Sequence, residues 1–306
     1  MTQILVSGAI HPDIDAFACA IAYVNYLNQL EARHNHNNNK YEAKFNDLGH
    51  IETNFVAQKL GFKVELIDPQ VKYDGFILVD ASGRDGLPSI FEAEKVLEVI
   101  DHRLFPDYDY FPNAQFRIEP VGAAATQIAE FYYFNHAVKL SPEIATLLLC
   151  AIYSNTNNFL ADTTTFRDFR MKNWLAQNAS QPELPDQMFK YKTDYILNNL
   201  EEVLVSDSKV VKLSNATSFD FLQLEMANGN LVADNLELPI ILEKVSSVPD
   251  YFLAIQNIST AKTIILTNKI DLLYKLKQTG LQINESANYF ELDAIYMRKT
   301  LIQKLK

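Results

Sequence analysis

The stretch Ile4–Asp15 reads ILVSGAIHPDID, and it determines the fold prediction for the first half of the chain. Its apolar start predicts a short buried strand. Beyond it, apolar residues such as Phe17 and Ile21 recur at helical spacing, which predicts a helix. The carboxylates of Asp13 and Asp15 therefore lie in the turn where a strand meets a helix.

The same alternation of strand and helix patterns continues to about residue 154. Further strands are predicted at 41–45, 63–67, 76–79 and 96–100. Helices are predicted at 53–60, 123–134 and 142–154. Alternating elements of this kind are typical of an α/β fold whose parallel sheet is covered on both faces.

A polar stretch with two prolines, Ser180–Pro185, predicts a linker. Strand patterns after it, at 203–213, 219–226, 251–255 and 263–267, predict a smaller second α/β domain. A chain of 306 residues is long enough for two cores. We therefore expect a first domain at 1–180, a linker at 181–190 and a second domain at 191–306.

Composition limits the partners of this chain. Its net charge is −11, which is unfavourable for binding the phosphates of duplex nucleic acid. Its longest apolar run, Ile144–Tyr153, is shorter than the roughly 20 residues that cross a bilayer. The first residues lack a signal-peptide pattern, and the two cysteines, Cys19 and Cys150, lie in apolar helical patterns that predict buried reduced thiols. We expect a cytoplasmic protein that binds neither membrane nor duplex.

Ionisable residues follow three predicted strands: Asp13 with Asp15, then Asp80, then Asp101 with His102. Each has an ordinary structural explanation, because Asp caps helices and forms turns, and a single His is more often a hydrogen-bonded structural residue. Strand ends of an open α/β sheet are, however, where ligands bind. Carboxylates with an imidazole, and no cysteine, suit Mn²⁺ or Mg²⁺.

The order of several short motifs is more specific than any one of them. The chain resembles the DHH phosphoesterase superfamily with its DHH-associated C-terminal domain, and within it the family II manganese-dependent inorganic pyrophosphatases and the Prune-type exopolyphosphatases. The matching stretches are His11–Ala16, Val79–Asp80, Asp101–Arg103, Pro120–Thr126, Ala151–Thr156, Thr163–Thr165, Asp207–Lys209, Phe221–Glu225 and Met297–Lys299.

The resemblance implies two domains with an active site in the cleft between them, and two divalent ions, Mn²⁺ or else Co²⁺ or Mg²⁺. By position, Asp13 would bind the first ion, Asp15 and His102 the second, and Asp80 both. Two such ions activate a water and hold the attacked phosphoryl group. The resemblance also implies phosphate binding by the three cations Lys209, Arg298 and Lys299.

Three positions depart from the pyrophosphatase pattern. Ala9 stands where those enzymes have a metal-binding His, and Asn155 stands where they have a metal-binding Asp. Arg103 replaces the last His of the DHH motif, as it does in Prune-type proteins, and its guanidinium suits a phosphate better than a metal. His11 could serve the first ion instead of Ala9, although it could equally fill the turn. Whether one ion or two would bind is left open.

The leading hypothesis is a metal-dependent hydrolase of phosphoanhydride bonds, in pyrophosphate or short polyphosphate, with Asp80, His102 and Arg103 as catalytic residues. One alternative is a degenerate homologue that binds a phosphorylated ligand or a protein without turnover. Another is a phosphodiesterase acting on a small nucleotide. The sequence also leaves a homodimer open.

Overall fold

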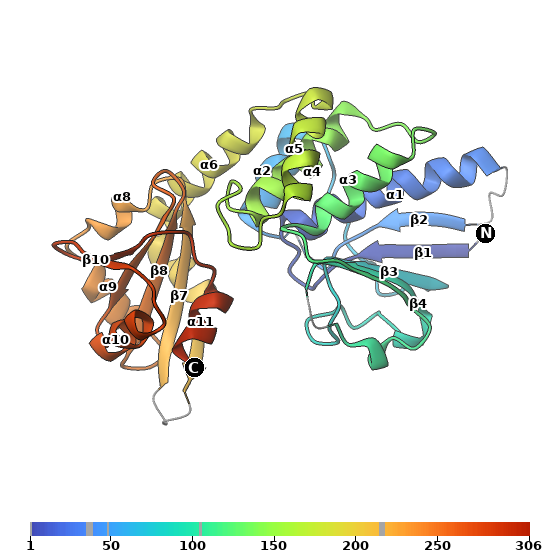
Figure 1. Cartoon of the computed structure of the whole chain (residues 1–306). Coiled ribbons are helices and arrows are strands. Elements are labelled where there is room, and N and C mark those ends of the chain that lie inside the picture. The colour runs from blue at the N-terminus through green and yellow to red at the C-terminus, as the bar shows by residue number, and fades with distance from the viewer. Residues whose placement is uncertain (1, 35–38, 48, 104–105, 214–217) are drawn as a thin grey trace. The chain divides into compact units, whose positions relative to one another are not determined.

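The computed structural model describes residues 2–34, 39–47, 49–103, 106–213 and 218–306. These residues form two compact units, each described here by itself (Figure 1). The first unit comprises residues 1–159 and 163–188, and the second comprises 160–162 and 189–306. Residues 184–190 of the expected linker belong to a helix, α6, at Leu184–Asn198.

The first unit contains a parallel sheet in the order β2-β1-β3-β4-β5, which confirms the predicted fold class. Its strands are β1 Thr2–Ser7, β2 Asn39–Ala43, β3 Gly75–Val79, β4 Val96–Asp101 and β5 Gln115–Ile118. Its helices are α1 Ile14–His34, α2 Ile51–Leu60, α3 Ala124–Phe134, α4 Pro142–Asn155 and α5 Phe166–Asn178, with short 3-10 turns at Ala93–Lys95 and Tyr108–Tyr110.

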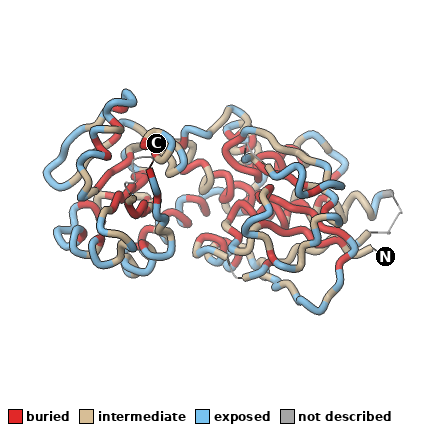
Figure 2. Tube along the Cα trace, turned by 90° about the horizontal axis from the view of Figure 1, so that it is seen from below, coloured by how far each residue is buried: buried red, intermediate tan, exposed pale blue. Residues whose placement is uncertain are grey.

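The burial of each strand matches its position in the sheet. Every residue of β3 is buried, as expected for an interior strand of a parallel sheet covered on both faces. Figure 2 marks the buried residues of the chain in red. The edge strand β2 is protected by a side chain of α1: the Asn28 amide donates to the Tyr41 carbonyl at 3.1 Å and accepts from the Tyr41 N–H at 3.3 Å. Such pairing hides the edge from other strands.

The strand predicted at 63–67 was wrong. Only Phe45 pairs with this stretch, through hydrogen bonds to Glu65 and Ile67, because β2 has already ended at Ala43. The helix predicted at 53–60 is confirmed. It ends at Gly61, whose φ of 74° is the left-handed conformation that terminates many helices.

The second unit contains a mixed sheet in the order β10-β11-β9-β8-β7-β6. Its strands are β6 Lys209–Lys212, β7 Ser218–Met226, β8 Tyr251–Asn257, β9 Lys262–Thr267, β10 Ile283–Glu285 and β11 Phe290–Leu292. Its helices are α7 Leu200–Ser206, α8 Asn230–Ala233, α9 Leu238–Val245, α10 Ile270–Gln278 and α11 Arg298–Leu305.

This second sheet separates two apolar cores. Alternate residues of β8 enter opposite cores, so that Leu253 packs with Leu204 and Leu242 while Phe252 packs with Leu276 and Leu305. The stretch 203–213, predicted as strand, is instead the end of α7 followed by β6. No helix among the described residues is both long and apolar enough to cross a membrane.

Candidate metal centre

The two carboxylates at the turn between β1 and α1 make different contacts. Asp13 Oδ1 accepts hydrogen bonds from the N–H groups of Asp15 at 3.0 Å and Ala16 at 2.9 Å, which is the geometry of a helix cap. The turn packs closely at Gly8, where a Cβ atom would lie 2.9 Å from the Val79 carbonyl oxygen. Asp13 therefore caps the N-terminus of α1 with one of its two carboxylate oxygens.

Asp15, in the first turn of α1, is fully buried. Its two oxygens accept hydrogen bonds from the N–H groups of Ala124 and Ala125, each at 2.8 Å. Those groups open α3, whose N-terminal dipole favours a negative charge. The Asn155 amide, at the end of α4, also donates to Asp15.

Asp80 follows β3 and has an unusual backbone, with φ of 51°. This left-handed conformation is uncommon for a residue other than glycine, and strain of this kind is concentrated at functional sites. The side chain is 3% exposed, and its Oδ1 makes no hydrogen bond with any described residue. A buried carboxylate oxygen left in this state is available to a cation.

Asp101 is the last residue of β4, and His102 and Arg103 follow it. Asp101 Oδ1 accepts the N–H groups of His102 at 2.6 Å and Arg103 at 3.2 Å, which fixes the turn. His102 Nδ1 lies 2.9 Å from the Val121 carbonyl oxygen, which can only accept, so Nδ1 carries the proton. His102 Nε2 therefore faces inward, 3.4 Å from Asp80 Oδ1.

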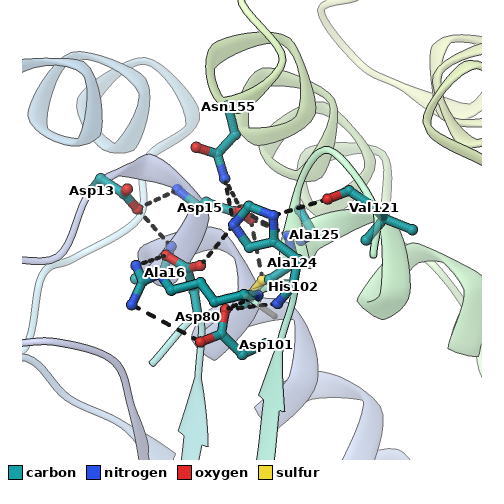
Figure 3. A network of polar contacts seen from close by, with 12 residues as sticks. Asp13, Asp15, Ala16, Asp80, Asp101, His102, Val121, Ala124, Ala125 and Asn155 are labelled. Atoms are coloured by element: carbon teal, nitrogen blue, oxygen red, sulfur yellow. Dashed lines mark hydrogen bonds and ion pairs between the residues drawn. The ribbon is translucent and has the colours of Figure 1, made fainter. Parts of the chain in front are cut away.

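Three of these residues form a candidate metal centre (Figure 3). Asp15, Asp80 and His102 each offer one ligand atom, and these atoms lie within 4.8 Å of one another. Asn155 Nδ2 lies 3.5 Å from His102 Nε2, beside the same space. The donors are two carboxylates and an imidazole with its other nitrogen held by a carbonyl, a set that fits Mn²⁺ or a similar divalent ion.

The electrostatics of this space favour a cation. Burial, with the charge of Asp80 added, raises the pKa of Asp15 to about 8. Burial and Asp80 also raise the pKa of Asp13. Burial alone would lower the pKa of His102, but the nearby carboxylates of Asp80 and Asp15 raise it to about 10. Asp15 thus holds a proton at neutral pH, and a metal ion would displace it.

Sequence reasoning missed Asp168, a fully buried residue of α5. Its carboxylate accepts from Gly122 N–H at 3.1 and 3.0 Å and from the Thr126 hydroxyl at 2.6 Å. It also accepts from the N–H and hydroxyl of Thr165, both at 2.7 Å, in a capping box. The segment 121–125 that Asp168 holds carries the contacts of Asp15 and His102. The Thr-x-x-Asp spacing was the only signal in the sequence.

The remaining positions that the sequence singled out in this unit lie differently. The His11 ring contacts Asp47, and its side chain is 76% exposed. Ala9 offers no ligating atom. Arg103 is 52% exposed, with Nη2 3.8 Å from Asp80 Oδ2 and Nη1 3.9 Å from Asp101 Oδ2.

The three predicted phosphate-binding cations belong to the second unit. Lys209 begins β6 and is exposed, and Lys299, in the first turn of α11, is also exposed. Arg298 begins α11, forms an ion pair with Asp207, and lies 5.8 Å from the ring centroid of Phe221. The three cations therefore lie on two elements of this unit, β6 and α11.

Comparisons with known proteins extend over nearly the whole chain. A family model described as the DHH family, N-terminal domain, matches residues 3–152. A protein of Bacillus cereus named as a manganese-dependent inorganic pyrophosphatase is 31% identical over 301 residues, which are 95% of this chain and 89% of that protein. A Bacillus anthracis protein of the same name is 30% identical over the same length.

Two solved structures share the fold. A Methanococcus jannaschii chain described as a family II inorganic pyrophosphatase aligns over 99% of both chains, with a TM-score of 0.64 and 24% identity. An exopolyphosphatase-related protein of Bacteroides fragilis aligns over 99% of this chain and 90% of its own, with a TM-score of 0.53 and 12% identity.

Proposed function

Because the chain belongs to the DHH family and its curated relatives are named manganese-dependent inorganic pyrophosphatases, we propose that it is a divalent-metal-dependent hydrolase of phosphoanhydride bonds. Its proposed substrate is pyrophosphate or a short polyphosphate, and its proposed cofactor is Mn²⁺. The observation that carries the proposal is the convergence of Asp15, Asp80 and His102 within 4.8 Å.

Each residue of the centre has a proposed task. Asp15, Asp80 and His102 hold the metal, which when bound supplies a water of lowered pKa and polarises a phosphoryl oxygen. Val121 keeps His102 in the tautomer whose Nε2 is directed inward, and the α3 N-terminus keeps Asp15 in place. Asn155 presents its amide N–H to Asp15, so coordination through Oδ1 requires this amide to rotate.

The cations have a second task, at the substrate. Arg103 makes no guanidinium hydrogen bond to Asp80 or Asp101 at 3.8 and 3.9 Å, so its donors can reach a phosphate oxygen. Lys209, Arg298 and Lys299 are proposed to neutralise the charge that develops on the leaving phosphate. The two buried free thiols, Cys19 and Cys150, fit a cytoplasmic location.

A screen of phosphate release tests this function directly. The protein is incubated with Mn²⁺, Co²⁺ or Mg²⁺ and with pyrophosphate, tripolyphosphate or a cyclic dinucleotide. Release from the first two substrates, lost after chelation and in Asp80→Ala, supports the proposal. Release of nucleotide alone would indicate the phosphodiesterase instead.

The alternative of a binding protein without turnover is favoured by Ala9 and Asn155, which stand at two positions where the resemblance implies metal ligands. Bound metal separates the two functions. A protein that binds pyrophosphate but neither Mn²⁺ nor Co²⁺, even at millimolar concentration, would be a degenerate homologue.

A further inference from the structure

The guanidinium of Arg103 lies beside two carboxylates. Nη2 is 3.8 Å from Asp80 Oδ2, and Nη1 is 3.9 Å from Asp101 Oδ2. Both carboxylates are buried, with exposures of 3% and 0%. Figure 3 shows Asp80 and Asp101 as neighbours below the imidazole of His102.

These carboxylates have oxygens with no protein donor. Asp80 Oδ1 and Asp101 Oδ2 are buried and make no hydrogen bond with any described residue. A buried carboxylate oxygen without a hydrogen bond is costly unless a cation compensates it. The two oxygens of Asp80 face different cationic groups: Oδ1 is closest to His102 Nε2, and Oδ2 is closest to Arg103 Nη2.

Ligand donors are distributed unequally around Asp80. The imidazole nitrogen His102 Nε2 lies 3.4 Å from Oδ1, and with Asp15 these residues make up the metal cluster. A second ion on Oδ2 would require its own ligands. Of the residues that the sequence offers for it, His11 contacts Asp47 with its side chain 76% exposed, and Asp13 already caps α1 through one oxygen.

We propose that this centre holds one divalent ion, on Asp15, Asp80 and His102, and that the guanidinium of Arg103 takes the place of a second ion at Asp80. The inference rests on the proposed function only in placing a metal at that cluster. Arg103 stays protonated and cannot activate a water, so the nucleophilic water belongs to the single metal. The guanidinium supplies charge and two parallel donors to a phosphate.

Mn²⁺ stoichiometry tests this arrangement. We would compare wild type, Arg103→Ala, Arg103→Lys and the control Arg84→Ala by calorimetric titration and by counting bound Mn²⁺ after gel filtration in excess metal. Arg84 is the control because it is an exposed arginine in the segment after β3. Its side chain is 65% exposed, and its Nε lies 4.0 Å from Asp85 Oδ1. We expect one ion per chain in wild type, Arg103→Lys and Arg84→Ala, and a second, weaker ion in Arg103→Ala, which leaves Asp80 and Asp101 uncompensated.

Electron paramagnetic resonance provides an independent readout. Single Mn²⁺ ions give an isolated six-line signal, whereas two ions sharing Asp80 are exchange-coupled. The coupled signal is expected only in Arg103→Ala. Two ions in wild type, with hydrolysis intact, would overturn this inference and leave the proposed function standing. One ion in Arg103→Ala would also overturn it. Wild type with one ion but no hydrolysis would support the inference and contradict the function.

Discussion

Replacing Asp168 by Asn should weaken metal binding although Asp168 is not a predicted ligand. Its carboxylate holds Gly122, Thr126 and Thr165 through five contacts of 2.6–3.1 Å. The adjoining residues carry the contacts of the metal cluster: Val121 to His102, and the first N–H groups of α3 to Asp15. The metal ligands therefore depend on the position of this turn.

The magnitude follows from these hydrogen bonds. Bonds to a charged group contribute about 1.5–3 kcal/mol each and neutral ones about 0.5–1.5 kcal/mol, so neutralising the acceptor loses about 1 kcal/mol per bond. In the Asp168→Asn variant the amide NH₂ cannot accept a hydrogen bond, so the donors that face it lose their acceptor. We therefore expect Asp168→Asn to lower the free energy of unfolding by roughly 2–4 kcal/mol. Loss of outer contacts to metal ligands typically weakens metal binding about 10- to 100-fold.

The control is Glu130→Gln. Glu130 is another buried carboxylate, on α3, but its partners are the guanidinium groups of Arg167 and Arg170. In urea, the Glu130→Gln variant should show a comparable decrease in the free energy of unfolding, and its Mn²⁺ affinity should equal that of wild type. Titrations are made at a temperature where all three proteins are folded. If Asp168→Asn is destabilised and still binds Mn²⁺ with the wild-type affinity, the turn does not position the ligands.

Four further outcomes are expected. Asp80→Ala should reduce phosphate release at least 1,000-fold while the protein stays folded by circular dichroism; activity within a few-fold of wild type would place the site elsewhere. Arg298→Ala should weaken substrate binding or turnover with bound Mn²⁺ unchanged, and an equal effect from Lys306→Ala would indicate nonspecific basic charge. Asn155→Asp should tighten Mn²⁺ binding about tenfold or more, measured by calorimetry, because a carboxylate adds negative charge to the ligand set. Mn²⁺ affinity should fall as pH drops below about 8, because the raised pKa of Asp15 means that the metal must displace its proton.

In the metal-free protein, the raised pKa of Asp15 makes the folded state more stable at acidic pH than at alkaline pH. The folded pKa of Asp15 lies above its unfolded value of 3.8, so protonation of Asp15 favours folding at acidic pH. That contribution is lost as the pH rises through about 8. Melting curves with and without Mn²⁺ should therefore differ most at alkaline pH, and a difference independent of pH between 6 and 9 would contradict the protonated Asp15.

The strand ends were predictable because a parallel sheet collects the carboxyl ends of its strands at one edge. Asp15, Asp80 and His102 come from such ends, and the structure brings them together. The contribution of Asp168 was not predictable, because it lies 46 residues from Gly122 and the pairing is tertiary. The left-handed backbone of Asp80 also has no sequence signal, because aspartate adopts it only occasionally and most aspartates do not.

The stretch before β6 shows a different limit. Leu200, Val203 and Leu204 pack on one core at helical spacing, but valines at 203 and 205 favoured a strand in the sequence. Intrinsic preference was overridden by burial of one helical face. Where an apolar stretch is short, its period and its propensity can disagree, and packing decides.

The charges of the departures from the pyrophosphatase pattern point in one direction. Where the resemblance implies a metal-binding Asp, Asn155 carries one negative charge less, and where it implies a His, Arg103 carries one positive charge more. Together they raise the charge of the centre by two, which is the charge of one divalent ion. Ala9 removes a ligand and leaves the charge unchanged. In the arrangement that we propose, one metal and the guanidinium of Arg103 compensate the buried carboxylates, so the three departures fit one change in the charge of the centre.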